Sequence, residues 1–247
     1  MADKKLIDKC RICQKAFFPF PMGEKNGYLL ESCRACGSVM TRPWVTQENL
    51  DKFFGEVQPV ATHLIEPDIE IAINEGLIAK ACPGEPAGKR FLDIASRQGY
   101  AVMAAKNLGM QPLGISSHEF FTKFAQEVYS PDLFKHISLQ DYAASDPPKA
   151  DFILAQETFT EQPDIESYMA ALSRVLAPNG VIYIEEADGN SFNLPKRFSE
   201  WAYAEPPLNF VYYSKKGLTA VLNRHGLAVQ KMFFTWKPMM RMVVVKQ

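Results

Sequence analysis

The sequence predicts a doubly wound α/β fold, in which a mostly parallel seven-stranded sheet follows a small N-terminal zinc ribbon. Two observations support this prediction. From residue 90 onward, short apolar runs alternate with longer segments of helical periodicity, which is typical of parallel strands joined by crossover helices. Before that point, four cysteines form two closely spaced pairs. We expect residues 1–45 to form the ribbon, 46–88 a helical connector and 89–247 the α/β domain.

The composition is that of an ordinary globular protein. The chain has 247 residues, 47% hydrophobic and 22% charged, with a formal net charge of −1, which allows a sizeable core. This near-neutral balance argues against nucleic acid or an anionic membrane as a partner. The first residues lack the apolar run of a secretory signal, and no apolar stretch is long enough to span a membrane. We therefore expect a cytoplasmic protein, and nothing in the composition specifies its oligomeric state.

The cysteine pairs predict a structural zinc site. Cys10 and Cys13 form one pair, Cys33 and Cys36 form the other, and nineteen residues separate the pairs. Two such knuckles on a hairpin can place four thiolates around one tetrahedral ion, and a site made of four sulfurs is closed and structural. Two disulfides, or four unrelated buried thiols, are the alternatives. The lack of a secretion signal disfavours disulfides.

The remaining elements follow in order along the chain. Thr46 is expected to cap a short helix, and apolar residues within 57–81 recur mostly at helical spacing before a Pro/Gly-rich loop. Strands are expected at 90–94, 111–116, 135–142, 150–156, 181–186, 227–236 and 239–247, and helices at 99–110, 117–130, 164–180 and 214–226. The short link around Lys237 and Pro238 requires the last two strands to be antiparallel. Residues 187–213 form a long irregular stretch with many aromatics.

Three motifs carry a resemblance to a known family. "FLDIASRQGY" at 91–100 stands where a glycine-rich cofactor loop is usual, "VIYIEEADGN" follows as a fifth strand and its exit, and "NFVYYSKKGLTAVLNRHGLAV" is a late aromatic segment entering a helix. Together with the ribbon, they resemble class I S-adenosylmethionine (SAM)-dependent methyltransferases that carry an N-terminal zinc ribbon. The resemblance covers essentially the whole chain. It implies a Rossmann-like methyltransferase fold and SAM as cofactor.

The motifs also depart from the family pattern. The family's first motif generally reads "LDxGCGxG", so Ala95 and Arg97 replace two glycines and Gly99 remains. Ser116 stands where relatives carry an acid that binds both ribose hydroxyls. Asn209 stands where a histidine is frequent, and "AQETFTEQPD" replaces "HVLEH" after the fourth strand.

The resemblance implies a set of cofactor-binding residues. They are Asp93, Ala95, Arg97, Gly99, Ser116, Asp141 and Gln156. Asp93 would order the loop and Asp141 would contact the adenine amino group, although each could equally be an ordinary solvated acid. Arg97 lies where the cofactor carboxylate would bind, so it could aid binding or fill the pocket. Three alternatives therefore stay open. The loop binds SAM, it belongs to a cofactor pocket that is altered or empty, or it is an ordinary connection between strand and helix.

The candidate catalytic residues lie beyond the fourth strand and in the aromatic stretch. Glu157 and Glu161 could act as general base toward an acceptor, or could simply begin a helix, where acids are favoured. Asn209 and Tyr212 could line a substrate pocket, or could pack a lid against the domain. Further candidates for lining such a pocket are Tyr203 and Tyr213. We expect methyl transfer from SAM to a small polar metabolite such as a sugar nucleotide. The alternative is a non-catalytic protein of the same fold with a degraded cofactor pocket, used for binding or regulation.

Overall fold

The computed structural model describes residues 9–56 and 66–247, without the side chains of 54–56. Residues 57–65, where the predicted connector helix would begin, lie outside this part. Two connector helices are present, α1 (Gln47–Glu56) and α2 (Pro67–Ala81). Thr46 caps α1 as predicted, because its Oγ1 accepts a hydrogen bond from the Asn49 N–H at 3.3 Å. Among the described helices, none is both long and apolar enough to cross a membrane.

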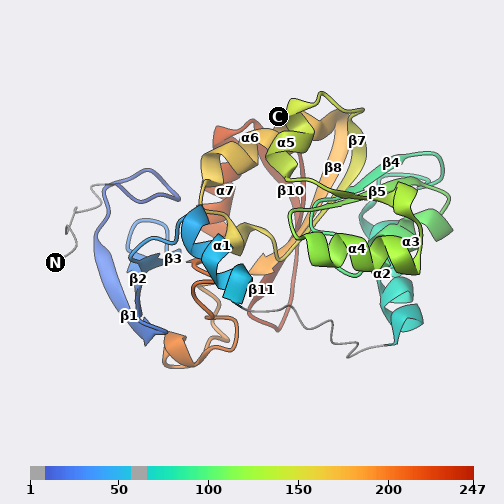
Figure 1. Cartoon of the computed structure of the whole chain (residues 1–247). Coiled ribbons are helices and arrows are strands. Elements are labelled where there is room, and N and C mark those ends of the chain that lie inside the picture. Colours follow the sequence, from blue (N-terminus) through green and yellow to red (C-terminus); the bar gives the residue numbers. More distant parts are fainter. Residues whose placement is uncertain (1–8, 57–65) are drawn as a thin grey trace.

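A seven-stranded sheet forms the centre of the molecule and confirms the predicted fold (Figure 1). Its strands lie in the order β10-β11-β8-β7-β4-β5-β6. They are β4 (Arg90–Asp93), β5 (Gln111–Ser116), β6 (Phe134–His136), β7 (Ala150–Gln156), β8 (Leu176–Ala187), β10 (Leu227–Phe233) and β11 (Met239–Lys246). The pairs from β6 through β8 are parallel. β11 pairs antiparallel with both β8 and β10, as the short link between the last two strands requires.

Helices cover both faces of this sheet, and alternating strand residues pack against each layer. The helices are α3 (Tyr100–Asn107), α4 (Glu119–Val128), α5 (Leu139–Ala144), α6 (Ile165–Val175) and α7 (Lys215–Arg224). On β7, Phe152 and Leu154 pack in the cluster that contains residues of α2, α3 and α4. Ile153 and Ala155 pack in the cluster that contains residues of α5, α6 and α7. This alternation is the side-chain period of a strand buried on both faces.

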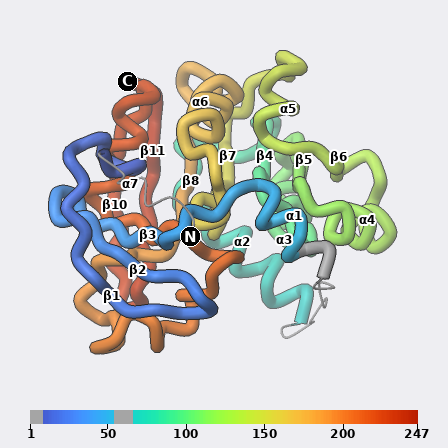
Figure 2. Tube along the Cα trace, turned by 60° about the vertical axis from the view of Figure 1, so that its left-hand side comes forward, coloured from blue at the N-terminus to red at the C-terminus, as the bar shows by residue number. Residues whose placement is uncertain are grey.

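A second sheet joins the ribbon to the end of the aromatic stretch. It contains β1 (Pro19–Lys25), β2 (Tyr28–Cys33), β3 (Val39–Arg42) and β9 (Val211–Tyr212), in that order. Figure 2 shows the ribbon lying beside α7, which is far from it in sequence, and Arg224 of α7 donates to the Ile12 carbonyl at 2.8 Å. Ser214 secures the junction, because its N–H donates to Ser38 Oγ at 3.0 Å and its hydroxyl donates to the Cys36 carbonyl. A Cβ at Gly217 would come within 2.1 Å of Ser38 Oγ, so only glycine fits at this contact.

Several boundaries differ from the predicted ones. The strand expected at 135–142 ends at His136, because Ser138 caps α5 by accepting the Asp141 N–H. The helix expected at 164–180 ends at Val175, because Leu176 already pairs with Ala150 on β7. The stretch 187–213 is also more ordered than predicted, since it contains β9 and a short 3₁₀ turn, η3 (Phe198–Glu200). Two further 3₁₀ turns are η1 (Pro131–Leu133) and η2 (Phe159–Glu161).

Candidate functional site

The four ribbon cysteines gather as a metal site. Their sulfur atoms all lie within 4.8 Å of one another. The Cys10 and Cys36 sulfurs are 3.9 Å apart, and those of Cys13 and Cys33 are 4.0 Å apart. Tetrahedral coordination with Zn–S bonds of about 2.3 Å places the sulfurs about 3.8 Å apart, whereas a disulfide bond measures about 2.05 Å. The cluster therefore fits a zinc ion and does not have the geometry of paired disulfides.

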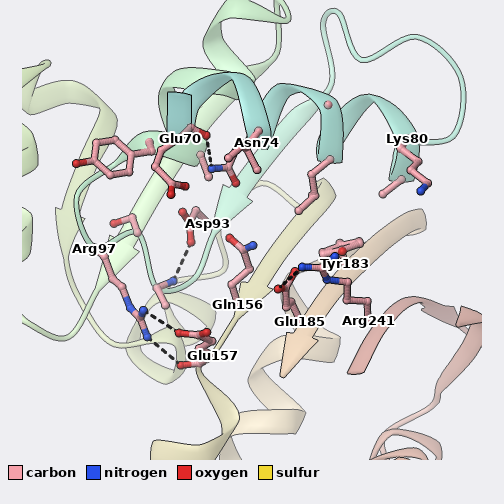
Figure 3. A pocket seen from close by; sticks show the side chains of 18 of the residues that line it. Glu70, Asn74, Lys80, Asp93, Arg97, Gln156, Glu157, Tyr183, Glu185 and Arg241 are labelled. Carbon is pink, nitrogen blue, oxygen red and sulfur yellow. Dashed lines mark hydrogen bonds and ion pairs between the residues drawn. The ribbon is translucent and has the colours of Figure 1, made fainter. Parts of the chain in front are cut away.

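A larger site lies at the carboxyl ends of the central strands, where ligands of open α/β sheets bind. It is a cavity of about 820 Å³ between α2 and the ends of β4, β7 and β8. This volume falls in the upper part of the range of about 300–1,000 Å³ that is usual for small-molecule sites. Figure 3 shows α2 running above the cavity, Arg97 and Glu157 at one end, and Tyr183, Glu185 and Arg241 at the other.

The loop after β4 forms one wall of the cavity. The carboxylate of Asp93 is buried and accepts the Ala95 N–H at 3.0 Å. Burial raises the pKa of Asp93 to about 7, while the Ala95 N–H and the Arg97 cation act in the opposite direction. Gly99 begins α3 with φ of +86°, and a Cβ there would come within 2.7 Å of the Phe134 ring. The one glycine that the loop retains is thus required by its backbone and by its packing.

Arg97 reaches across the cavity from this loop. Its Nη1 lies 3.1 Å from Glu157 Oε2, and its Nη2 donates to the Glu157 carbonyl at 3.3 Å. Both residues have positive φ, +35° and +51°, a conformation uncommon for residues other than glycine. Glu161 lies nearby on η2, and burial raises its pKa to about 7. Arg97 opposes this rise and the Glu157 carboxylate adds to it.

Two residues of this region lie outside the predicted catalytic and cofactor-binding sets, although the sequence places one of them, Tyr203, among the possible pocket-lining residues. Glu186 is fully buried and accepts three backbone N–H groups, from Thr158 at 3.1 Å, Phe159 at 2.8 Å and Ala187 at 3.0 Å. It therefore holds the loop that carries Glu157. The run "VIYIEEADGN" ends in adjacent acids, and strand alternation places one of them on each face, which is the signal that could have found Glu186.

Tyr203, the second of these residues, comes from the aromatic stretch. Burial and the neighbouring Glu157 carboxylate raise its pKa well above the usual value. The phenol therefore keeps its proton and can donate a hydrogen bond to Glu157, although Tyr203 is not among the lining residues of the cavity. Nothing in the sequence distinguishes Tyr203 from the other tyrosines of residues 187–213.

The structure brings only part of the predicted cofactor set together. Asp93, Ala95, Arg97, Gly99 and Gln156 line the cavity, together with Glu157 from the catalytic set. Glu161 from the same set is not among the lining residues.

Ser116 and Asp141 do not line this cavity. The Ser116 hydroxyl accepts the His118 N–H at 3.1 Å. The Asp141 carboxylate accepts from the Ser138 hydroxyl at 2.6 Å at the start of α5. Their roles toward the ribose and the adenine of a cofactor remain predictions.

The other two catalytic candidates hold the aromatic stretch together. Asn209 accepts a hydrogen bond from the Thr160 hydroxyl at 3.0 Å and donates to the Tyr203 carbonyl at 3.2 Å. Tyr212 is fully buried on β9, and its hydroxyl donates to the Asn209 carbonyl. Neither side chain lines the cavity. Their direct part in catalysis thus remains a prediction, whereas their contacts place Tyr203.

Comparison with known proteins adds two sequence matches. Residues 70–232 match the family described as a methyltransferase domain. A ubiquinone biosynthesis O-methyltransferase of Thiobacillus denitrificans is 28% identical over 109 residues, which make up 42% of this chain and 47% of that enzyme. The chain therefore matches about half the length of this curated relative.

Solved structures share the fold. A protein of Pyrococcus horikoshii superposes with a TM-score of 0.60 at 14% identity, covering 79% of this chain and 99% of that one. The 1,6-didemethyltoxoflavin-N1-methyltransferase of Burkholderia thailandensis, solved with its substrate and S-adenosylhomocysteine (SAH), has a TM-score of 0.59 at 15% identity. That superposition covers 92% of this chain and 99% of that one.

Proposed function

This chain belongs to the family of methyltransferase domains, and we therefore propose that it transfers a methyl group from SAM to a small polar acceptor, of which a sugar nucleotide is one example. The observation that carries the proposal is the position of the cavity. It lies at the carboxyl ends of β4 and β7, against the loop 94–99 that begins α3. In open α/β sheets, this edge is where nucleotide-like ligands bind.

The charges at this end of the cavity fit the methionyl half of SAM. Asp93 and Glu157 offer carboxylates to its ammonium group and its positively charged sulfur, and Arg97 offers a guanidinium to its carboxylate. Asp93 would hold the ammonium group, because its carboxylate accepts the Ala95 N–H within the loop and keeps acceptor capacity toward the cavity. On the ribose side, Ser116 would supply a single hydroxyl in place of the usual acid.

When bound, SAM supplies a methyl group on a positively charged sulfur. The protein's own work is then to align the acceptor and to remove a proton from it if the accepting atom carries one. We assign that proton to Glu161, which lies on η2 within the field of the lining residues Arg97 and Glu157 and outside the cavity lining itself, and whose pKa near 7 suits a base at neutral pH. Glu157 balances the charge of Arg97 through their 3.1 Å ion pair. The Tyr203 phenol keeps its proton and serves as a hydrogen-bond donor.

Calorimetry with SAM and SAH tests the proposal. A hydrogen bond to a charged group contributes about 1.5–3 kcal/mol and a neutral one about 0.5–1.5 kcal/mol. We therefore expect Asp93→Asn to weaken SAM binding about tenfold, and Ser116→Asp to strengthen it about thirtyfold. The wild-type dissociation constant should be weak, in the range of tens of micromolar or poorer, since a neutral serine replaces the ribose-binding acid.

Two matched variants serve as controls. Asp146→Asn changes an exposed acid outside the cavity, and Glu119→Ala removes an exposed acid that pairs with Lys123 at 2.8 Å. Neither should change SAM affinity. Loss of binding in Glu119→Ala would instead show that Glu119 holds the ribose. If neither SAM nor SAH binds the wild type at millimolar concentration, the proposed activity is wrong and a non-catalytic role takes its place.

A further inference from the structure

The cavity has opposite charges at its two ends. At the end near β4 and β7, the acids Asp93 and Glu157 outnumber the single cation Arg97. At the end near β8, β10 and β11, the acid Glu185 stands against several cations. Those cations are Lys80, Lys237 and Arg241. Figure 3 shows Arg97 and Glu157 on one side of the cavity and Lys80, Glu185 and Arg241 on the other, with Asp93 and Gln156 between them.

The guanidinium at the basic end is only partly engaged. Arg241 Nη2 lies 2.8 Å from Glu185 Oε1. Its Nε is buried, and within residues 9–56 and 66–247 it has no hydrogen-bond partner. A buried donor without a partner is costly, and a guanidinium carries five N–H donors in a fixed plane. The Arg241 side chain as a whole lines the cavity and is 40% exposed, so its other N–H groups can donate to an anion there while Nη2 keeps its contact with Glu185.

Aromatic rings surround the same end. Phe233 has two ammonium groups over its ring, Lys80 at 5.2 Å and Lys231 at 4.8 Å. Phe234 lines the cavity although 71% of its surface is exposed. The ring of Trp236, which is 74% exposed, meets Phe234 edge-on with the ring centroids 5.0 Å apart. Exposed aromatics grouped in this way are typical of binding surfaces, because flat rings stack on flat ligands.

We propose that this basic, aromatic end is the acceptor subsite, and that it binds a planar ring carrying a negatively charged group. The ring would stack on Phe234, and the anion would lie among Lys80, Lys237 and Arg241. The positively charged donor would occupy the acidic end, so the charges of the cavity orient the two ligands toward each other. This inference rests on the proposed function for the place of the donor.

Binding of simple probes tests the subsite without turnover. Uridine monophosphate and benzoate represent the two sources of such chemistry, a nucleotide and an aromatic acid. Uridine and benzyl alcohol are their neutral counterparts, and inorganic phosphate is an anion without a ring. Calorimetry measures each affinity, and the fluorescence of the exposed Trp236 reports whether a probe contacts the aromatic pair Phe234 and Trp236. We expect at least one anionic ring compound to bind more tightly than both its neutral counterpart and phosphate.

Lysine variants test the part that charge plays in this binding, with a matched control outside the cavity. The pair Lys80→Gln and Lys237→Gln removes two exposed cations from the cavity and should weaken binding of the anionic probe about tenfold. The pair Lys106→Gln and Lys196→Gln also removes two exposed cations, but outside the cavity lining, and should leave the affinity of the anionic probe unchanged. Phe234→Ala should weaken the ring-bearing probe. Raising the salt concentration should weaken binding of the anionic probe to the wild type more than binding to the Lys80/Lys237 double variant.

The outcomes separate this inference from the proposed function. Equal affinity for anionic and neutral probes, no effect of the double variant, or failure of both anionic probes to bind at millimolar concentration would each overturn the inference. If SAM binds in those experiments, the proposed function still stands. If the probes bind as expected and SAM does not, the subsite stands and the proposed methyl transfer fails.

Discussion

Arg97 and Glu157 connect the two loops on which the candidate site is built. Each has a positive φ and each belongs to a different strand exit, so their ion pair ties the loop after β4 to the loop after β7. Glu161 lies within the field of both charges. Its protonation therefore depends on how these two neighbours are arranged.

Substitution of Glu157 and substitution of Arg97 should move the pKa of Glu161 in opposite directions. Glu157→Gln removes a like charge, so the pKa of Glu161 should fall from about 7 toward 4.5. Arg97→Gln removes the opposing cation, so the pKa should rise by about one unit or more. Carboxyl-carbon NMR titration measures both shifts, with Glu161→Gln to assign the signal.

The enzymatic consequence is a pH profile. If Glu161 is the base, its carboxylate form increases as pH rises through 7, and kcat/KM for the acceptor should rise over the same interval. Glu161→Gln should lower kcat by roughly two to four orders of magnitude and leave SAM affinity intact. A pH-independent rate, or an unchanged kcat in Glu161→Gln, would remove this residue from the mechanism.

At the scale of elements, β3 and β9 link the metal site to the aromatic stretch. Val39 pairs with Tyr212 and Met40 with Val211, while Ser214 binds the carbonyl of the metal-ligating Cys36. Because closed zinc sites couple metal binding to local folding, the ion should support β9 and the start of α7 as well as the ribbon.

Removing zinc should therefore loosen a segment distant in sequence. After chelation, or in Cys33→Ser, we expect amide hydrogen exchange in residues 211–217 to speed up about tenfold or more, with little change in α3. Cys82→Ser is the matched control, because Cys82 lies outside the cluster and should retain zinc and protection. If loss of zinc speeds up exchange only in residues 10–36, the ribbon and the α/β domain are energetically independent.

Periodicity in the sequence predicts the elements that are regular and buried. The strands that become β4, β5, β7 and β8 each contain a short apolar run, and their parallel order follows from the helices between them. The two-residue strand β9 could not be predicted, because its backbone partners lie on β3 and two residues carry no period. The end of α6 was also misplaced, because pairing of Leu176 with β7 overrides the helix-stop signal of Pro178.

At the scale of the whole molecule, buried acids couple stability to pH. The pKa of Asp93 is raised from 3.8 to about 7 in the folded protein, so the folded state binds the proton more tightly than the unfolded one. The stability from this group is present below pH 4 and is lost as pH rises through about 7. Asp93→Asn retains an acceptor for the Ala95 N–H but does not titrate.

The wild type should therefore lose stability relative to Asp93→Asn as pH rises from 4 to 7, and the difference should level off above that range. Urea unfolding of both zinc-loaded proteins at several pH values measures this difference in the free energy of unfolding. Because both proteins bind zinc in the same way, the pH dependence of metal binding cancels when one free energy is subtracted from the other. The free energy of unfolding of Asp141→Asn, an exposed substitution, should change with pH in the same way as that of the wild type. A pH-independent difference between wild type and Asp93→Asn would show that the pKa of Asp93 is not raised.

The assembled site was only partly predictable. Asp93, Arg97, Gln156 and Glu157 follow strand ends, and the fold brings strand ends together, so their meeting follows from topology. The basic end of the cavity depends on where α2 and the β10–β11 turn lie over the sheet. No local pattern around Lys80 or Phe234 encodes that placement. Tyr203 is likewise positioned by contacts made only after the chain has folded.

The contact between Ser38 and Ser214 spans 176 residues, and this has a consequence for synthesis on the ribosome. At about 5–20 residues per second, roughly 9–35 seconds separate the appearance of the two serines. All four metal ligands are made before that interval begins. The nascent ribbon can thus capture its ion early, yet its inner face, with Ile12 and Met40, has no partner until the last quarter of the chain emerges. During that time the bound metal ion has to stabilise the fold of the ribbon, including this apolar surface, without the rest of the domain.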